Sequence, residues 1–556
     1  MKYGFVIDNR KCIGCHACTV ACKSEHDVPV GVNRTWVKQT EKGEYPNTRR
    51  IFSVLRCNHC TDAPCVTICP TQALFTRDDG IVDFDNQRCI GCKSCMQACP
   101  YDALYIDPET NTAAKCNYCA HRVDIGLEPA CVNVCPEHAI ISGDMHDPNS
   151  EIAQLIAVQQ VTVRKAEKGT IPNVFYVDGD MASLNPEVTE RNEQYMWSQQ
   201  AAGVGHYAKY ADDRLGTTDL MQMLEELNTK DRISTSPALD KEMGTTKPTS
   251  QHSAQRSVKT VEALMGTANA KRVYDTPDKG ILWGWEVSGY VWTKAISAGA
   301  ILVPFIAWLF GWAVLDTTTM YISGIVSLVF LMATGVLLVM DLDQPFRFHY
   351  VLLRPQWNSW LVRGAYAITF FGGMVALLLA GVFFGWTDVV YVAFWASAVS
   401  AVVVAIYTAF LFAQAKGRDF WQSPAMAPHM LVHSLMAGAA VFVLVGLVTD
   451  ASVQWVDYLE TLLIIAAVAN ILIMTVELTI THPTSDAKRV VKMITDGRYS
   501  NGFWYGAMLV GNVIPLGLLV LTDNLMLSAA SAVLILVGIY FSEKIWVEAP
   551  QRIQLT

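Results

Sequence analysis

The sequence predicts three parts: a cysteine-rich head, a polar linker and an all-α membrane domain of eight transmembrane helices. All 16 cysteines lie between Cys12 and Cys135, and a stretch rich in Ser, Thr, Lys and Asp follows them. Long apolar runs begin only near Trp283. A chain of 556 residues has room for such a division. The three parts are expected at residues 1–184, 185–280 and 281–556.

The cysteines of the head form four groups of four, and the first and third groups share the spacing C-x2-C-x2-C-x3-C. A tight loop with this spacing supplies three thiolates to one iron–sulfur cubane, and the fourth cysteine ligates the other cluster of a pair. Sixteen thiolates therefore predict four [4Fe-4S] clusters. Structural zinc also uses C-x2-C pairs, but it seldom has three cysteines at this spacing before a fourth. The groups are Cys12, Cys15, Cys18 and Cys22; Cys57, Cys60, Cys65 and Cys69; Cys89, Cys92, Cys95 and Cys99; and Cys116, Cys119, Cys131 and Cys135.

These motifs, with KGTIPNVFY at residues 168–176, resemble the four-cluster electron-transfer subunits of the molybdopterin oxidoreductases, such as those of DMSO and polysulfide reductases. The resemblance covers roughly residues 1–180 and implies an α+β ferredoxin-like head. It also implies that groups one and four share two clusters, and groups two and three share two. The implied ligand sets are set one (Cys12, Cys15, Cys18, Cys135), set two (Cys22, Cys116, Cys119, Cys131), set three (Cys57, Cys60, Cys65, Cys99) and set four (Cys69, Cys89, Cys92, Cys95).

The location of the head is predicted from its first residues, MKYGFVIDNRK, which contain no apolar stretch long enough for a secretory signal. A cytoplasmic head keeps its thiols reduced, so its dense cysteines indicate metal rather than disulfides. The net charge of −9 comes without a basic run, which disfavours nucleic-acid binding. The linker, with stretches such as STSPALDKEMGTTKPTSQHSAQRS, is typical of a polar tether.

Eight apolar runs follow the linker, and each approaches or exceeds the roughly 20 residues that cross a bilayer. Lys and Arg gather in the loops that share the side of the head, whereas the four opposite loops carry Asp and neither Lys nor Arg. The positive-inside rule therefore predicts an inner-membrane protein with its head in the cytoplasm. The runs lie near residues 288–314, 321–340, 364–386, 388–413, 430–449, 456–480, 503–521 and 525–547.

The membrane domain is predicted to be two four-helix bundles, because Tyr290-x3-Lys294-x3-AGA recurs 139 residues later as His429-x3-His433-x3-AGA. The stretch DLDQPFRF at residues 341–348 resembles the NrfD/PsrC family, the quinone-reactive membrane subunits of the same oxidoreductases. That resemblance implies a quinone pocket in the first bundle, close to the head, and no haem. A polysulfide-reductase-like pocket uses a histidine on helix 1 and a tyrosine on helix 4. Tyr290 stands at the histidine position here, and Tyr407 is the candidate tyrosine.

Polar residues within the apolar runs are candidate functional groups, because ionisable side chains in a bilayer are costly. Tyr290, Lys294, Tyr407 and Asp341 are candidates for quinone binding. Lys294 would either donate a hydrogen bond to a quinone, or snorkel to the interface or pair with Asp341. His429, His433 and Glu477 are proton-relay candidates, with a structural role as the alternative. Two histidines on one face of one helix cannot grip both sides of a haem, so none is expected.

The sequence therefore predicts an electron-transfer and membrane-anchor subunit of a molybdopterin-type oxidoreductase. It would connect a catalytic partner to menaquinone or ubiquinone, with sulfite or another inorganic sulfur compound among the candidate substrates of that partner. Nothing in the chain resembles a molybdopterin-binding domain, so the terminal substrate chemistry is expected on the partner. The alternative is a redox-driven proton-translocating module. Ionisable residues cluster near the head side of the helices rather than at mid-depth, which favours the quinone hypothesis.

Overall fold

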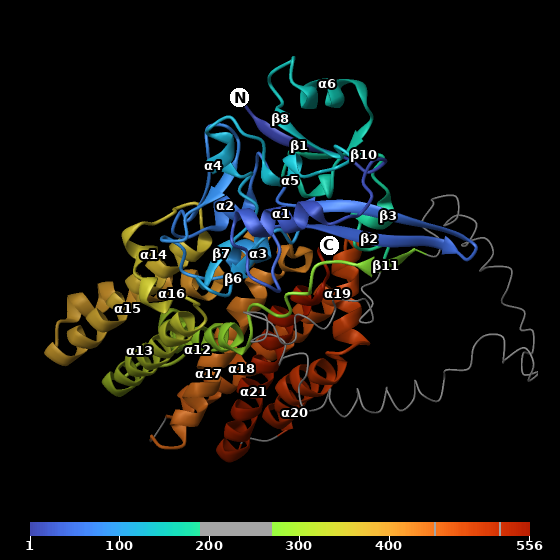
Figure 1. Cartoon of the computed structure of the whole chain (residues 1–556). Coiled ribbons are helices and arrows are strands. Elements are labelled where there is room, and N and C mark those ends of the chain that lie inside the picture. Colours follow the sequence, from blue (N-terminus) through green and yellow to red (C-terminus); the bar gives the residue numbers. More distant parts are fainter. Residues whose placement is uncertain (190–269, 450–451, 522–523) are drawn as a thin grey trace, which may run out of the picture.

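The computed structural model describes residues 1–189, 270–449, 452–521 and 524–556. A head of short strands and helices sits on one end of a group of long helices (Figure 1). Most of the predicted linker, residues 190–269, lies outside the described residues.

The head is built around a four-stranded sheet with strand order β8-β1-β10-β9. β1 runs parallel to β10 and antiparallel to β8, so the first and last parts of the head pair with each other. Phe5, Val6 and Ile7 are fully buried, because β1 has side chains packed on both faces. The elements are β1 (Tyr3–Asp8), β8 (Ile140–Asp144), β9 (Val161–Thr162), β10 (Val174–Val177), and the helices α6 (Glu151–Val158) and α7 (Met181–Leu184).

A long hairpin, β2 (Thr35–Glu44) and β3 (Asn47–Arg56), forms a second sheet. β11 (Lys271–Tyr274) adds antiparallel to the outer edge of β2. β11 comes from the last residues of the predicted linker, so the chain is joined to the head directly before the first membrane helix. Its alternating residues RVY suit a half-buried edge strand, although they are too few to be recognised from periodicity.

The cysteine loops are followed by short helices that pack in two pairs. α1 (Ala17–Glu25) contacts α5 (Ala130–Asn133), and α2 (Pro64–Ile68) contacts α3 (Ser94–Ala98). This is the pairing of groups one with four and two with three that the resemblance implies. The α+β ferredoxin-like head is thereby confirmed. The remaining elements are α4 (Ala120–Val123) and the hairpins β4 (Leu74–Thr76)–β5 (Val82–Phe84) and β6 (Tyr105–Asp107)–β7 (Thr112–Ala114).

Within the described ranges, eight helices are long and apolar enough to cross a membrane, as predicted. The first ends earlier than expected because Gly311, with φ of +65°, follows its last turn and breaks the helix. The seventh begins with a π-helix, Gly502–Val513, before α20 (Ile514–Leu521). The other spans are α12 (Trp285–Leu309), α13 (Thr317–Met340), α15 (Trp360–Phe384), α16 (Thr387–Gln414), α17 (Met426–Gly446), α18 (Val453–Thr479) and α21 (Leu525–Glu548).

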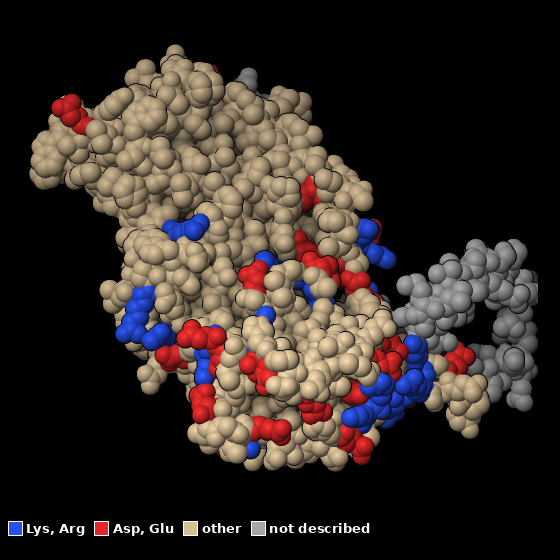
Figure 2. Space-filling model, turned by 90° about the horizontal axis from the view of Figure 1, so that it is seen from above, with Lys and Arg blue, Asp and Glu red and all other residues tan. Residues whose placement is uncertain are grey.

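The outer faces of these helices are apolar. Ile325, Val329, Met332 and Val336 form one stripe along α13 and are each at least half exposed, which suits contact with lipid rather than water. Figure 2 shows charged side chains gathered on one part of the surface and nearly absent from a broad neighbouring part. The chain is therefore a multi-pass membrane protein.

The spans form the two predicted four-helix bundles, which meet where α12 packs against α17. Gly299 of α12 and Gly438 of α17 touch: a Cβ on Gly299 would lie 1.9 Å from the Ser434 carbonyl oxygen and 2.8 Å from Gly438 Cα. These glycines are 139 residues apart, the offset of the repeat. Residues at equivalent positions of the two repeats can touch only near the rotation axis that relates the two bundles. The contact of Gly299 with Gly438 therefore supports the duplication.

The loops after α13, α16 and α18 and the segment after α21 contact the head, as the alternation of the spans predicts. Gln344 N–H donates to the Ile90 carbonyl (3.2 Å), Arg418 Nε to Gln97 Oε1 (2.9 Å), and Gln97 Nε2 to Gln551 Oε1 (2.6 Å). An amphipathic helix, α19 (Ser485–Thr495), lies between the sixth and seventh spans and was not predicted. One further short helix, α14 (Tyr350–Leu353), follows α13.

Candidate functional site

All 16 cysteines are free of disulfide bonds, and two of the predicted sets surround cavities in the head. One cavity has all four cysteines of set one in its wall, and another has all four of set four. Set one joins α1 and its preceding loop to the loop after α5. Set four joins the end of α2 to α3 and the loop before it. Groups far apart in the sequence therefore meet as the resemblance implies.

The cysteines of sets two and three also lie together. Burial raises the pKa of Cys22, and neighbouring thiols of its own set add to the rise, namely Cys116, Cys131 and Cys119. Burial likewise raises the pKa of Cys65, and the thiols of its own set, Cys99, Cys57 and Cys60, add to the rise. Burial disfavours the charged thiolate, so four buried thiols are costly to ionise. A bound metal removes this cost, because the thiolate is the form that binds metal.

The loops that carry the cysteines need glycine at the repeated CIGC motif. Gly14 and Gly91 have φ of +72° and +70°, a region that side chains with a Cβ seldom adopt. At Gly91 space is also limiting, because an added Cβ would lie 2.7 Å from the Cβ of Asp343 in the membrane domain. The glycine that shapes the cysteine loop thus also allows the head to sit close to the helices.

The buried charge of Arg56 shows whether the surroundings of the cysteines suit iron–sulfur clusters. Its side chain is fully buried, and Nη1 donates to Cys131 Sγ (3.0 Å). No carboxylate forms an ion pair with Arg56 among the described residues. A buried guanidinium needs a compensating negative charge, which neutral thiols or disulfides would not supply. A cubane held by four thiolates carries net negative charge, so the donors and the buried cation both fit iron–sulfur clusters.

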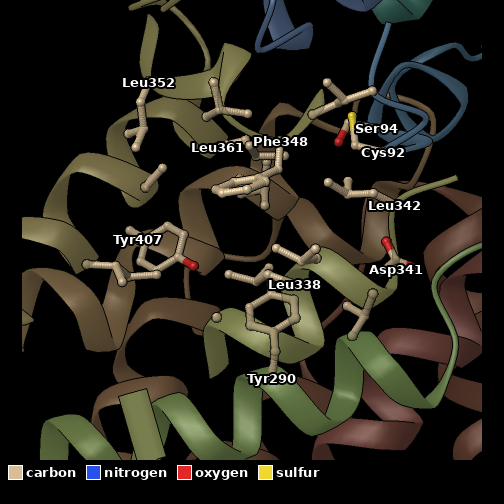
Figure 3. A pocket seen from close by; sticks show the side chains of 18 of the residues that line it. Cys92, Ser94, Tyr290, Leu338, Asp341, Leu342, Phe348, Leu352, Leu361 and Tyr407 are labelled. Atoms are coloured by element: carbon tan, nitrogen blue, oxygen red, sulfur yellow. The ribbon is translucent and has the colours of Figure 1, made fainter. Parts of the chain in front are cut away.

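A cavity of about 240 Å³ lies at the junction of the head and the first bundle. Cys92 and Ser94 line it from the head, while Tyr290 of α12 and Tyr407 of α16 line it from the membrane domain. Figure 3 shows the two tyrosines reaching the cavity from different helices, with Cys92 and Ser94 on its head side. Most of the remaining wall is apolar, including Leu338, so the cavity suits a flat, lipophilic molecule with few polar groups.

Lys294 is not among the residues that line this cavity. Its Nζ donates to Thr408 Oγ1 (2.5 Å) and to the Ala405 carbonyl (3.2 Å), and lies 4.7 Å from the centre of the Tyr407 ring. Lys294 is 1% exposed, so it does not reach the interface. Among the described residues, the cation paired with Asp341 is Lys93 and not Lys294, in contrast to the alternative hypothesis. It stands behind Tyr407 and holds one wall of the cavity through that ring.

Asp341, the residue after α13, lines the cavity and is bonded to the head. Lys93 Nζ donates to the Asp341 carbonyl oxygen (2.5 Å) and to its Oδ1 (3.2 Å). Burial raises the pKa of Asp341 to about 7, although Lys93 acts in the opposite direction. A carboxyl that titrates near neutral pH can both give and accept a proton at this edge of the cavity.

The proton-relay candidates meet in the second bundle. His433 Nδ1 and Glu543 Oε1 are hydrogen-bonded (2.6 Å), and His429 Nδ1 lies 3.6 Å from Glu477 Oε2. The rings of His429 and His433 pack edge to face, with centres 4.2 Å apart. Glu543 was not among the predicted residues. An acidic side chain within the last apolar run was the signal that could have found it.

Comparisons with known families divide the chain in the same way. The family described as "Polysulphide reductase, NrfD" matches residues 276–542. Two families described as "4Fe-4S dicluster domain" match residues 11–74 and 48–145. The head therefore binds iron–sulfur clusters, and the helices form an NrfD-type membrane domain.

Relatives of the head are named as subunits of reductases. A tetrathionate reductase subunit of Salmonella typhimurium is 45% identical over 203 residues, which are 36% of this chain and 80% of that protein. A polysulfide reductase subunit of Wolinella succinogenes is 43% identical over 181 residues, 32% of this chain and 94% of that protein. The arsenate respiratory reductase iron–sulfur subunit of a Shewanella species is 34% identical over 225 residues, 32% of this chain and 96% of that protein. The chain thus belongs to the family of 4Fe-4S dicluster electron-transfer subunits, and carries an NrfD-family membrane domain on the same polypeptide.

Proposed function

We propose that this chain transfers electrons between a catalytic partner subunit and membrane quinone through four [4Fe-4S] clusters. The observation that carries the proposal is the junction cavity, whose wall contains both a cysteine of set four, Cys92, and the tyrosines of the first bundle. A quinone there would lie beside a cluster ligand, with a lipophilic wall around its ring. Residues 1–184 act as the electron-transferring part and residues 281–556 as the quinone-reacting anchor.

The partner is a molybdopterin-containing catalytic subunit, in line with the resemblance of the head. Relatives named as tetrathionate and polysulfide reductase subunits support an inorganic sulfur compound, such as sulfite, as its substrate. The four ligand sets hold the clusters, which supply one-electron transfers when bound. The chain itself contributes the thiolates, the buried cations beside them and the insulating protein around them.

In the junction cavity, the hydroxyls of Tyr290 and Tyr407 bind the carbonyls of menaquinone or ubiquinone. A quinone carbonyl gains negative charge on reduction, and a donor aimed at it in a low-dielectric site stabilises that charge. Lys294 acts through Tyr407, holding the ring in place. Asp341 stands at the head-side edge, where it exchanges the proton that accompanies reduction.

A second role, in proton movement, is favoured by the buried ionisable groups of the second bundle. His433, Glu543, His429 and Glu477 form a connected series, and each is at most 3% exposed. Such groups are costly in a membrane unless they are paired or functional. Because each is near a neighbour that can receive a proton, we propose this series as a proton relay. No haem is part of this proposal.

The positive-inside rule supports placing the chain in the inner membrane, with the head in the cytoplasm. The loops in contact with the head and the helix ends beside them carry the Lys and Arg residues of the membrane domain, apart from Lys294. Electrons would then enter and leave on the cytoplasmic side of the membrane.

Filling the junction cavity tests the proposed function. Leu338→Trp places a larger side chain in its wall, whereas Leu377→Trp changes a side chain of α15 that is 39% exposed on the outer face. In purified chain with dithionite-reduced clusters, Leu338→Trp should stop reoxidation by a menaquinone or ubiquinone analogue, with iron content unchanged. Leu377→Trp should reoxidise at the parental rate. Parental reoxidation in Leu338→Trp would show that quinone reacts elsewhere.

A further inference from the structure

Arg56, the last residue of β3, is a buried cation that belongs to a cysteine set rather than to a salt bridge. Its side chain is fully buried, Nη1 donates to Cys131 Sγ (3.0 Å), and the guanidinium carbon lies 4.5 Å from the centre of the Phe5 ring. Within the described part of the chain, Nε and Nη2 have no hydrogen-bond partner. Because Arg does not lose its proton in proteins, this charge is permanent.

A histidine contacts the same cysteine set. A ring nitrogen of His26 lies 3.2 Å from Cys119 Sγ. Set two therefore has a guanidinium group and an imidazole within hydrogen-bonding distance of its sulfurs.

The surroundings of the other sets differ. In sets one and four, hydrogen bonds to sulfur come from backbone N–H groups: Ala139 to Cys135 (3.3 Å), and Gly91 and Ala113 to Cys89 (3.4 and 3.3 Å). Arg56 also acts electrostatically on Cys18 of set one, but its hydrogen bond goes to Cys131 of set two. Lys115 lies beside set three, and its ammonium donates to the carbonyls of Val82 and Cys116, which compensate part of its charge.

We infer that Arg56 raises the reduction potential of the cluster held by set two and makes it the highest of the four. Reduction adds one negative charge to a cluster, and a fixed cation in contact with a ligand sulfur stabilises the reduced form. The effect is strong here because Arg56 is excluded from water. An electron on the chain would then rest at set two, in the interior of the head. This inference rests on the proposed function for its ligand sets, but not on the quinone site.

EPR-monitored redox titration of the purified full chain tests the inference. Arg56→Met removes the charge and the hydrogen bond to sulfur, an interaction that typically changes an equilibrium ten- to a hundredfold. The highest-potential cluster signal should therefore move about 60–120 mV to more negative potential, since tenfold is about 59 mV for one electron. Arg56→Lys, which keeps the charge, should move it less. Arg50→Met, an exposed arginine of the same strand, should move no signal.

Three results would overturn the inference: unchanged potentials in Arg56→Met with iron retained, movement of a signal other than the highest, or an equal shift in Arg50→Met. If Arg56→Met does not retain its iron, Arg56→Gln is titrated with the same expectation. The titration uses neither quinone nor partner, so a chain with unchanged potentials that still reduces quinone refutes this inference alone. A chain without clusters refutes the proposed function.

Discussion

Removal of one oxygen atom from the junction cavity gives the sharpest test of the quinone site. Tyr407→Phe deletes the hydroxyl and keeps the ring, so the contact with the Lys294 ammonium, 4.7 Å from the ring centre, is retained. The wall formed by Tyr407 against Gly364 also keeps its shape, because the ring carbons are the atoms nearest to that glycine. The stability of the membrane domain should therefore change little, while the charge that develops on a quinone carbonyl loses one donor.

The expected loss follows from the chemistry of that donor. A buried hydrogen bond to a charged group contributes about 1.5–3 kcal/mol, which corresponds to roughly ten- to a hundredfold in rate. Reoxidation of dithionite-reduced clusters by a quinone analogue, followed by cluster absorbance, should slow by this factor in Tyr407→Phe. Tyr540→Phe is the matched control, because Ile539-Tyr540 on the eighth span corresponds to Ile406-Tyr407 on the fourth. Parental turnover in Tyr407→Phe together with a slow Tyr540→Phe would place the pocket in the other bundle.

Four other outcomes are expected. Iron and acid-labile sulfide should each be about 16 per chain with negligible zinc, and values near half of this in fully assembled protein would contradict four clusters. Lys294→Met should slow quinone turnover at least tenfold without loss of iron, because Tyr407 loses the cation behind its ring; a parental rate would exclude that role. Gly299→Leu should lower the melting temperature in detergent far more than Gly373→Leu, since a Cβ at Gly299 meets the neighbouring helix and one at Gly373 meets nothing within 4 Å. Protease added to right-side-out spheroplasts should leave the head intact, and cleavage before lysis would reverse the predicted orientation.

The parts of the fold that were predictable are those with a long or repeated signal. Eight apolar runs of about twenty residues leave few alternatives to membrane helices, and cysteine spacing reflects the geometry of a cubane. α19 escaped prediction because its 11 residues mix apolar side chains with Lys488, Arg489 and Lys492, so they form no continuous apolar run. β11 escaped for a similar reason, since a strand of four residues has no resolvable period. Both elements pack against segments that are distant in the sequence, so only the tertiary structure determines their positions.

The location of the junction cavity was predictable from the sequence, but the residues that line it were not all predictable. The resemblance to quinone-reactive subunits pointed to the first bundle near the head, whereas Cys92 and Ser94 enter the wall only because two domains pack together. Helical spacing correctly placed Tyr290 and Lys294 on one face of α12, but it could not distinguish a side chain in the cavity from one behind Tyr407. That difference depends on the neighbouring helix, where Thr408 Oγ1 and the Ala405 carbonyl accept hydrogen bonds from Lys294 Nζ.

The duplication explains why one bundle keeps a cavity and the other a network of charges. Since Gly299 and Gly438 touch at equal positions of the repeat, the residues one turn or more before them, Lys294 and His433, lie at equal depth in neighbouring helices. A buried charge must find a partner at that depth. Lys294 donates to uncharged oxygens and packs against the Tyr407 ring, whereas His433 is hydrogen-bonded to the carboxylate of Glu543 at 2.6 Å. Because Glu543 also acts electrostatically on Lys294, His433 rather than Glu543 is the residue to substitute when the second bundle is tested separately from the cavity.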